Sequence, residues 1–514
     1  LGWRFGIRRL TIGLGIVTAM SLMASAWVLN HDAQASFFLL PTRAWELLAG
    51  SLLALLAGPK HGWKIPRAAG DGLAALGIAA IVLAIFAYDE TTRFPGVAAL
   101  LPVIGTVLIL AFATPATLAG RLLALPPLLW LGTISYSAYL WHQPLFAFAR
   151  LMLVNRPPPW LFGLLLVAAL GLAQLSYRFV EAPFRDRARV SRRQIFGFAV
   201  AGSVVIAAAG GGLVAARGMP QRFDPATVPL LTAGAAIEGC PAVDAWLYVC
   251  RFGDVQATRS IVLLGDSHAY ALRPALDAAL KRRRLGGYAV HTACHPIPGL
   301  FDSREALTPA RVAFCAEANR RLLAFVGRAD IIDTIVAVRW TLRLFPLSKS
   351  IDAPAFDNGE GGVEGDTPFR RNLTVDAAGK PSDAAGPKAR ALDTYIDALA
   401  ARHPTLIVYP VPEVGWTPQR VNLLAIARGK APPATISTSA ARYAARNAAA
   451  IQLLDALAAP GLLRTDPSRI LCYEPLPGRC IVQSHGTLYY ADDDHLARPA
   501  AQLVVEDALR RLER

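Results

Sequence analysis

Charged residues are scarce in this sequence. Asp, Glu, Lys and Arg make up 17% of its 514 residues, whereas hydrophobic residues make up 54%. Soluble chains are about one quarter charged, so a large part of this chain must face lipid rather than water. The scarcity is confined to residues 1–216, which read as nearly continuous apolar blocks, while residues 217–514 have the mixed composition of a globular protein. A chain of this length has room for both as separate domains.

Cysteine is absent from the first 239 residues. All six cysteines lie in the polar part, at Cys240, Cys250, Cys294, Cys315, Cys472 and Cys480. An even set confined to that part predicts disulfides in an oxidising compartment. Longer links require more ordering of the chain, so sequence neighbours are expected to pair. The expected disulfides are Cys240–Cys250, Cys294–Cys315 and Cys472–Cys480, although spacing alone leaves other connectivities open.

Motifs for nucleic-acid recognition are also missing. A net charge of +15 is typical of proteins that bind nucleic acid. No helix-turn-helix, zinc finger or surface of basic and aromatic residues accompanies it, however. We therefore exclude nucleic acid as a partner and expect part of the positive charge to lie in loops of the membrane half.

Seven blocks in residues 1–216 have the length needed to cross a bilayer, which takes about 20 apolar residues in a helix. They run over 10–29, 36–58, 72–88, 94–113, 126–149, 160–177 and 195–216. The chain starts at Leu1, and no cleavable signal precedes the first block. The membrane domain, residues 1–216, is therefore expected to be incomplete at its N-terminus and to hold about seven helices.

Basic residues in the loops set the orientation of these spans. Clusters of Lys and Arg precede the first block, follow the second and separate the sixth from the seventh, whereas the intervening loops carry few. With seven spans every basic cluster falls on one side, which is then the cytoplasm. We expect a multi-pass protein of the bacterial inner (cytoplasmic) membrane, with residues 217–514 in the periplasm or otherwise extracytoplasmic.

Residues 217–514 alternate between strand and helix patterns. Apolar runs typical of buried strands cover 260–264, 288–293, 331–340 and 406–412, and helical patterns cover 269–284, 308–326, 390–402, 438–458 and 495–513. Strands separated by helices predict an α/β domain with a parallel sheet covered on both faces. Residues 350–388 lack periodicity and are expected to form a loop or an insertion.

The sharpest local motif is LLGDSH at 263–268, in which a strand leads through a tight turn into a helix. Reactive groups in an open parallel sheet gather where strands end and helices begin. Ser267 at that place would be a nucleophile beside backbone N–H groups, which can stabilise the oxyanion of a tetrahedral intermediate. We expect its own N–H to be one such donor. The alternative is a structural role, in which Ser267 caps the following helix.

A second motif, YADDDHL at 490–496, supplies what an alcohol nucleophile needs. A serine requires a base within hydrogen-bond reach, and a carboxylate orients that base. Asp492 and His495 are three residues apart, so one short segment can present both. We expect a triad of Ser267, Asp492 and His495, with His268 packed beside the nucleophile rather than acting as the base. The acidic run has two other interpretations: it caps the last helix or binds a divalent cation.

His291, Cys294 and His295 raise the question of a zinc site. Structural zinc sites usually need four ligands at paired spacings, and only this cluster is present. We expect Cys294 to form a disulfide instead and predict no metal.

Arg43 and Glu46 place opposite charges inside an apolar block. Ionisable residues within a membrane span are costly and usually face a partner or a water-filled cavity. The two residues are one helical turn apart and can pair with each other. We expect them to lie on the path of the acyl group or substrate through the membrane. If the helix begins later than the block, both are interfacial instead.

Three motifs of the membrane half carry a resemblance. PTRAWELLAG (41–50), ISYSAYLWHQPL (134–145) and SYRFVEAPFR (176–185) resemble consecutive signatures in the latter part of bacterial acyltransferase family 3, whose members are integral membrane O-acyltransferases. The order of the Ser267 and Asp492–His495 motifs resembles that of SGNH-type esterases, which one branch of that family carries as a fused domain.

The resemblance implies an SGNH-type, flavodoxin-like three-layer fold for residues 217–514. It also implies transfer of an acetyl group from cytoplasmic acetyl-CoA, across the bilayer, to a cell-surface polysaccharide. Two features depart from the family. Its early helices, with their histidine, are absent from this sequence, and so is the Gly-x-Asn that usually supplies an oxyanion donor. Val338, Arg339 and Trp340 occupy the equivalent strand end.

Together the motifs and the resemblance predict a membrane-bound O-acyltransferase that modifies O-antigen, exopolysaccharide or cell-wall glycan. The main alternative is a membrane-tethered carbohydrate esterase that uses the same triad to remove acyl groups. A third class is a non-catalytic glycan-binding or transport-accessory protein.

Overall fold

The computed structural model describes residues 6–29, 32–57, 66–89, 92–153, 157–186, 189–232, 239–303, 307–345, 372–376, 379–473 and 476–513. The chain forms two compact units. The first comprises Leu1–His142 and Val167–Arg189, and the second comprises Gln143–Leu166 and Val190–Arg514. The helix at Arg192–Ala215 is part of the second unit, and the domain boundary at residue 216 stays a proposal.

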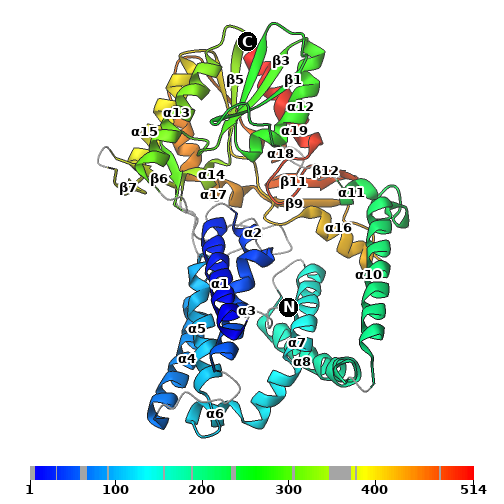
Figure 1. The fold of residues 1–514 in the computed structure, drawn as a ribbon. Coiled ribbons are helices and arrows are strands. Elements are labelled where there is room, and N and C mark those ends of the chain that lie inside the picture. The colour runs from blue at the N-terminus through cyan, green and yellow to red at the C-terminus, as the bar shows by residue number, and fades with distance from the viewer. Residues whose placement is uncertain are drawn as a thin grey trace. The chain divides into compact units, whose positions relative to one another are not determined.

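Helices occupy all seven apolar blocks of residues 1–216. They are α1 (Ile7–Leu29), α2 (Ala33–Phe38), α3 (Leu40–Ala57), α4 (Arg67–Ala87), α5 (Leu100–Phe112), α6 (Leu118–Leu123), α7 (Pro126–Met152), α8 (Pro159–Ser176), η3 (Tyr177–Glu181), α9 (Ala182–Arg185) and α10 (Arg192–Ala215). In the first unit α1 packs against α3, and α4 packs against α5 (Figure 1).

Four helices among the described residues are long and apolar enough to cross a membrane on their own. They are Ile7–Leu29, Arg67–Ala87, Pro159–Arg185 and Arg192–Ala215. The chain is therefore a membrane protein by length and composition of its helices. The count of seven spans stays a prediction.

The block at 36–58 forms two helices rather than one. Leu39 has an extended backbone, with φ −81° and ψ 132°, and it ends α2 directly before α3 begins. Pro41 lies in the first turn of α3, where its missing N–H costs nothing. A proline deeper inside a single helix would remove a hydrogen bond and clash with the preceding turn, so the chain breaks here.

The second unit contains a six-stranded sheet in the order β1-β3-β2-β5-β8-β10. The strands are β1 (Leu247–Gly253), β2 (Ser260–Gly265), β3 (Gly286–Thr292), β5 (Ile331–Ala337), β8 (Thr405–Val408) and β10 (Leu462–Thr465). β1 is antiparallel to β3, and the other neighbours are parallel. Counted along the chain, the five parallel strands have the flavodoxin-like order 2-1-3-4-5, which confirms the predicted fold class.

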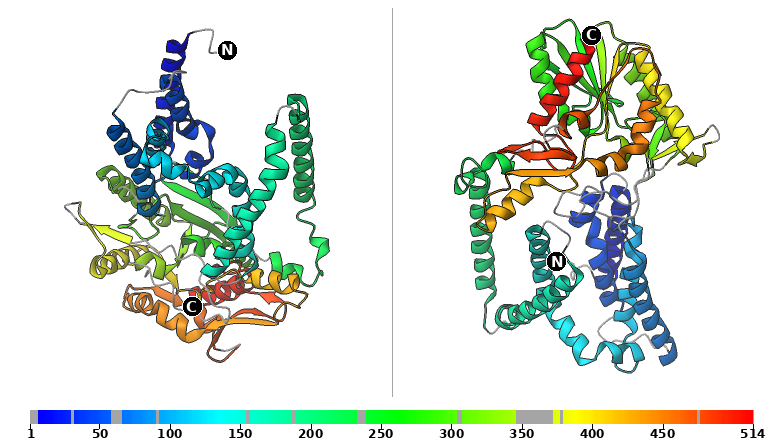
Figure 2. Two further views of the ribbon diagram at one scale, coloured as in Figure 1. Left: turned by 90° about the horizontal axis from the view of Figure 1, so that it is seen from below. Right: turned by 180° about the vertical axis from the view of Figure 1, so that it is seen from behind.

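Helices cover both faces of this sheet (Figures 1 and 2). α12 (Ser267–Arg283) and α19 (Arg498–Leu512) pack on one face, and α13 (Pro309–Val326), α15 (Ala385–Ala400) and α17 (Ala440–Asp455) supply the core on the other. Successive residues of β2 alternate between the two cores, with Ile261 and Leu263 in one and Val262 and Leu264 in the other. Burial on both faces explains why the strand reads as a continuous apolar run.

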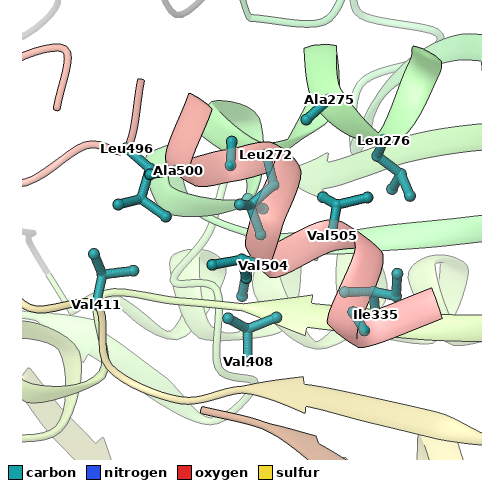
Figure 3. Packing of buried hydrophobic residues seen from close by; sticks show 14 of the residues in the cluster. Leu272, Ala275, Leu276, Ile335, Val408, Val411, Leu496, Ala500, Val504 and Val505 are labelled. Carbon is teal, nitrogen blue, oxygen red and sulfur yellow. The ribbon is translucent and has the colours of Figure 1, made fainter. Parts of the chain in front are cut away.

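The face that carries α12 and α19 has a close-packed apolar core. Leu272 and Leu276 of α12 meet Val504 and Val505 of α19 over Ile335 and Val408 of the sheet (Figure 3). Each large apolar side chain that leaves water contributes about 1.5–3 kcal/mol. This core fixes the start of α12 relative to the chain around residue 495, because α19 begins just after it.

Two small sheets and several short helices complete the second unit. They are the sheet of β4 (Leu300–Asp302), β6 (Asn372–Val375) and β7 (Pro381–Ser382), the sheet of β9 (Thr435–Ser439), β11 (Arg479–Ser484) and β12 (Thr487–Leu488), and α11 (Val228–Thr232), α14 (Trp340–Leu344), α16 (Pro418–Ala427) and α18 (Pro467–Leu471). Of the expected loop at 350–388, residues 350–371, 377 and 378 lie outside the described residues. The rest contains β6, β7 and the start of α15.

All three expected disulfides are formed. Cys240 bonds to Cys250, Cys294 to Cys315 and Cys472 to Cys480. The pairing of sequence neighbours is thus confirmed, and it leaves no free cysteine among the described residues.

Candidate active site

Ser267 is the first residue of α12, directly after the turn that ends β2. Gly265 has φ +145°, and a Cβ at this position would lie 1.8 Å from the carbonyl oxygen of Ala337. Only glycine allows β2 to run this close to β5. Asp266 caps α12 and accepts a hydrogen bond from the N–H of His268 at 3.1 Å. The interpretation of Ser267 as the helix cap is therefore wrong, because Asp266 fills that role.

The position of Ser267 in the sheet is the one at which α/β proteins bind ligands. β2 lies between β3 and β5, and the chain leaves it for β3 on one side before it continues to β5 on the other. The connections on the two sides run away from each other, which opens a crevice at the carboxyl end of β2. Ser267 lies at that end, and its side chain is partly exposed.

Asp492 and His495 are held together in one turn. The N–H groups of Asp494 and His495 donate to Oδ1 of Asp492 at 3.0 and 2.7 Å. Oδ2 of Asp492 lies 2.7 Å from Nδ1 of His495. The acidic run does not cap the last helix, which contradicts that alternative, because α19 begins only at Arg498 and its cap position is Ala497.

The second ring nitrogen of His495 is not used by Asp492. Nε2 is buried and has no hydrogen-bond partner among the described residues. The ring of His495 lies 5.2 Å, between centroids, from that of His268, the neighbour of Ser267. The structure thus brings the three predicted residues to the same end of the sheet. It does not form a hydrogen bond between Ser267 and His495; such bonds are often loose before substrate binds.

A buried ionic network lies next to the candidate triad. Oδ2 of Asp494 lies 3.1 Å from Nε2 of His268 and 3.0 Å from Nη1 of Arg339. Arg339 also binds both oxygens of Glu413, at 2.8 and 3.0 Å. Glu413 accepts a further hydrogen bond from Arg446 at 2.9 Å. His268 therefore lies beside Ser267 and hydrogen-bonds to Asp494, as expected.

Most of the ion pairs in this network could not be predicted from the sequence. Asp494 belongs to the acidic run, and Arg339 belongs to the strand end that replaces Gly-x-Asn. The sequence therefore drew attention to both residues but did not predict that they bind each other. Glu413 and Arg446 carried no local signal, because only the fold brings their segments together.

The pKa values of His495, Asp493 and Glu413 are shifted in different directions. Burial lowers the pKa of His495, but its hydrogen bonds to Asp492 and Asp494 and their charges outweigh burial and raise the pKa to about 10. Burial and the neighbouring carboxylates raise the pKa of Asp493 to about 7. For Glu413 burial alone would raise the pKa, but Arg339 and Arg446 lower it to about 2. Two carboxylates thus act on one imidazole, and the arginines keep the network behind them ionised.

Ser267 lines a cavity of about 690 Å³. The cavity lies within the range of about 300–1,000 Å³ that is typical of small-molecule sites. Its other lining residues include Gly265, Tyr270, His291, Asn319 and Arg343. His291 stacks on Tyr248 at 4.6 Å between ring centroids, and its Nδ1 shares a hydrogen bond with the hydroxyl of Tyr270. An acetyl group alone would leave most of this cavity empty, whereas a sugar would fill more of it.

Several of the possible metal ligands are engaged in other bonds, although the carboxylates of Asp492, Asp493 and Asp494 also lie close enough to share a cation. Cys294 is bonded to Cys315, which removes it as a thiolate ligand for zinc. His268, Asp494 and His495 place one ligand atom each within 4.8 Å of one another, so they could reach a common cation. Asp494 is already bound by His268 and Arg339, however. The prediction of a site without metal stays a prediction.

In the membrane half, Arg43 and Glu46 form the expected pair. Nε and Nη2 of Arg43 lie 3.1 and 3.0 Å from the two oxygens of Glu46. The guanidinium also lies 5.0 Å from the ring centroid of Phe37. Because α3 begins at Leu40, both charges lie in its first two turns rather than in the middle of a span. Their role in transfer stays a proposal.

The other two membrane motifs bind each other. The hydroxyl of Ser137 donates to Glu181 at 2.8 Å, and the indole N–H of Trp141 donates to Ser176 at 2.7 Å. Glu181 also pairs with Arg185 at 2.7 Å. Glu181 ends a π-helical turn at Tyr177–Glu181, a local distortion that often marks functional positions in helices.

Parts of this chain are similar to known proteins. OatA, a peptidoglycan O-acetyltransferase of Listeria monocytogenes, is 28% identical over 188 residues, which are 34% of this chain and 29% of OatA. YrhL of Bacillus subtilis is 29% identical over 200 residues, which are 36% of this chain and 31% of that protein. The matches therefore span less than a third of each relative. The periplasmic domain of a lipopolysaccharide acetyltransferase of Salmonella ser. Paratyphi A has a TM-score of 0.31 at 13% identity, covering 50% of this chain and 84% of that domain.

One family description matches the region built around the triad. Residues 238–510 match the SGNH domain that is fused to AT3 domains. The match covers more than half of the chain and includes Ser267, Asp492 and His495. The chain belongs to this family of SGNH domains fused to AT3 domains.

Proposed function

We propose that this protein is a membrane-bound O-acyltransferase that moves an acetyl group to a hydroxyl of a cell-surface polysaccharide. The observation that carries the proposal is the state of His495. Its Nδ1 is bound by Asp492 at 2.7 Å, while Nε2 is free and lies at the sheet end that holds Ser267. This is the arrangement that activates a serine for acyl transfer.

The proposed reaction has two steps. In the first, Oγ of Ser267 bonds to the carbonyl carbon of the acetyl donor, its proton passes to Nε2 of His495, and the leaving group departs with that proton. In the second, a sugar hydroxyl gives its proton to Nε2 and attacks the acetyl-serine, which returns the proton to Ser267. Asp492 holds the imidazole in the required orientation and stabilises its charged form.

The acyl group is proposed to come from acetyl-CoA on the cytoplasmic side. In this proposal the helical domain, residues 1–216, carries it across the inner membrane along a path that includes Arg43 and Glu46. The domain of residues 217–514 then acts outside the cytoplasm. OatA is named for peptidoglycan, which supports cell-wall glycan among the candidate acceptors, beside O-antigen and exopolysaccharide.

The test measures acetate released by mild alkali from surface glycan of cells that express the protein at matched levels. Ser267→Ala and His495→Ala are each expected to abolish nearly all transfer, and the double variant should lose little more, because a triad acts as a unit. Ser382→Ala, in β7 and outside the cavity lining, serves as the control and should acetylate normally.

Two outcomes would overturn the proposal. Full acetylation by Ser267→Ala would exclude the serine as nucleophile. Glycan that carries less acetate with the unaltered protein than without it would instead identify a carbohydrate esterase.

A further inference from the structure

The oxyanion hole of this site lacks its usual side-chain donor. No Gly-x-Asn is present in the sequence. The N–H of Ser267, at the first position of α12, donates to no group among the described residues. A single N–H stabilises the negative charge of a tetrahedral intermediate only weakly, because acyl-transfer enzymes direct several hydrogen-bond donors at that oxygen.

Arg339, the residue at the strand end that replaces Gly-x-Asn, is fully engaged elsewhere. Its guanidinium binds Glu413 through two nitrogens and Asp494 through the third. Its backbone N–H donates to Asp266 at 3.2 Å. All three guanidinium nitrogens of Arg339 and its backbone N–H are therefore already bound, so Arg339 is poorly placed to donate to a substrate.

Arg343, one turn later on α14, is placed differently. Only its Nε is used, in a hydrogen bond of 2.9 Å to Oδ2 of Asp266. Within the described parts of the chain, its two Nη groups bind nothing. The side chain is 21% exposed and lines the same cavity as Ser267. A guanidinium tied through one nitrogen to the residue before the nucleophile thus has four N–H bonds left for a ligand in that cavity.

We propose that Arg343 supplies the missing oxyanion donor, together with the N–H of Ser267. The inference rests on the proposed function of Ser267. As Oγ of Ser267 bonds to the carbonyl carbon, the π electron pair of the carbonyl moves onto its oxygen and the serine proton passes to His495. The oxyanion accepts hydrogen bonds from an Nη group of Arg343 and from the Ser267 N–H until the pair returns to expel the leaving group.

Asp266 makes this donor rigid. Its carboxylate accepts hydrogen bonds from the N–H groups of His268 and Arg339 and from Nε of Arg343. One buried carboxylate therefore positions both the start of α12 and the guanidinium. A donor that is already oriented in a partly enclosed cavity needs no reorganisation when the charge develops. The planar fork of arginine also keeps its Nη groups in a fixed direction once Nε is held.

Asn319 is the competing donor. It lines the same cavity, and its amide has no hydrogen bond among the residues that the structure describes. No bond ties it to the turn around Ser267, however, so nothing fixes its distance from the reacting carbonyl. Asn319→Ala therefore provides the discriminating variant.

The experiment measures hydrolysis of p-nitrophenyl acetate by the membrane protein in detergent. Arg343→Met is expected to lower kcat about 100-fold with KM changed less than about threefold, since loss of one oxyanion donor costs about 10²–10³ in kcat. Arg343→Lys keeps the charge but loses the fork and should lose most of the same activity. Arg328→Met, which removes an arginine paired with Asp330 outside the cavity, is the control and should remain active.

Chemical rescue separates catalysis from structure. Added methylguanidinium should restore part of kcat to Arg343→Ala and none to Ser267→Ala. If Arg343→Met and Arg343→Lys both keep kcat, or change only KM, the inference is overturned and Arg343 at most binds substrate. Loss of kcat in Asn319→Ala instead of Arg343→Met would overturn it equally. Full activity in Ser267→Ala would contradict the proposed function itself, whatever the arginine variants do.

Discussion

His495 is bound by two carboxylates at one nitrogen. Asp492 lies 2.7 Å and Asp494 3.0 Å from Nδ1. Burial lowers the pKa of His495, but these two groups raise it to about 10. At neutral pH the imidazole is then mostly protonated, and a protonated imidazole cannot take the proton of Ser267. The residue proposed as the base is thus held largely in its acidic form.

This protonation predicts an alkaline pH profile. For hydrolysis of an activated acetyl ester, kcat/KM should rise about tenfold per pH unit from pH 7 toward pH 9, because the neutral fraction of the free protein rises in that way. Asp494→Asn removes one of the two charges that raise the pKa, so its inflection should move to lower pH. Ser267→Ala supplies the background of spontaneous hydrolysis. Glu317→Gln on α13 removes a surface charge and should leave the profile unchanged.

A profile that is already flat at pH 7 would contradict the raised pKa of His495. An inflection that stays in place in Asp494→Asn would show that Asp492 alone sets it.

At the scale of elements, the turn from β2 into α12 depends on Gly265. Gly265→Ala should reduce the local unfolding free energy of this segment by more than about 3 kcal/mol, because the Cβ would overlap the carbonyl oxygen of Ala337. Gly429→Ala is the matched control. Gly429 also has a positive φ, +69°, but no atom lies within 4 Å of a Cβ there, so only about 1–2 kcal/mol of backbone strain is expected.

Peptide-resolved hydrogen exchange measures both changes. Faster exchange throughout β2 and α12 in Gly265→Ala, with little change in Gly429→Ala, is the expected result. Equal protection in the two variants would show that β2 and β5 can move apart at no cost.

The elements that could be predicted from sequence are strands buried on both faces and helices long enough to show several turns of apolar periodicity. β2, β3, β5 and β8 read as apolar runs, and α13 differs from its prediction by one residue at its start. The antiparallel edge strand β1 and the four-residue β10 were missed, since one is partly exposed and the other is too short for a pattern. The candidate triad could be proposed from sequence because its members lie in two compact motifs. The network of Arg339, Glu413 and Arg446 was not, because it joins three distant segments.

At the scale of the whole molecule, two separate features of the sequence predict which side of the membrane each part faces. Basic loops favour a cytoplasmic position for the segment before α10, and the three disulfides favour an oxidising compartment for the polar part. In intact cells, an impermeant thiol reagent should label Lys380→Cys from outside, once the outer membrane, if present, is permeabilised. Arg189→Cys should react only after the inner membrane is opened. Labelling of Arg189→Cys in intact cells would contradict the topology.

The last prediction separates the two chemical tasks of the proposed protein. In the proposed function a soluble activated ester reaches Ser267 without crossing the membrane, whereas an acetyl group from cytoplasmic acetyl-CoA must pass the helical domain. Glu46→Gln removes the partner of Arg43 in α3 and leaves the outer site untouched. It should therefore lose most glycan acetylation while it hydrolyses p-nitrophenyl acetate at the normal rate.

Ser267→Ala should lose both glycan acetylation and ester hydrolysis. The comparison distinguishes a defect in delivery of the acyl group from a defect in the reaction at Ser267. Asp186→Asn serves as the control, because this carboxylate pairs with Arg189 in an exposed position and its loss should spare both assays. Normal glycan acetylation in a well-expressed Glu46→Gln protein would place Glu46 and Arg43 at the membrane interface, as a simple surface pair. Loss of ester hydrolysis in the same variant would instead mean that the membrane pair supports the fold, since the ester has no need of the membrane path. Only the split result ties a charge inside the helical domain to delivery of the acyl group.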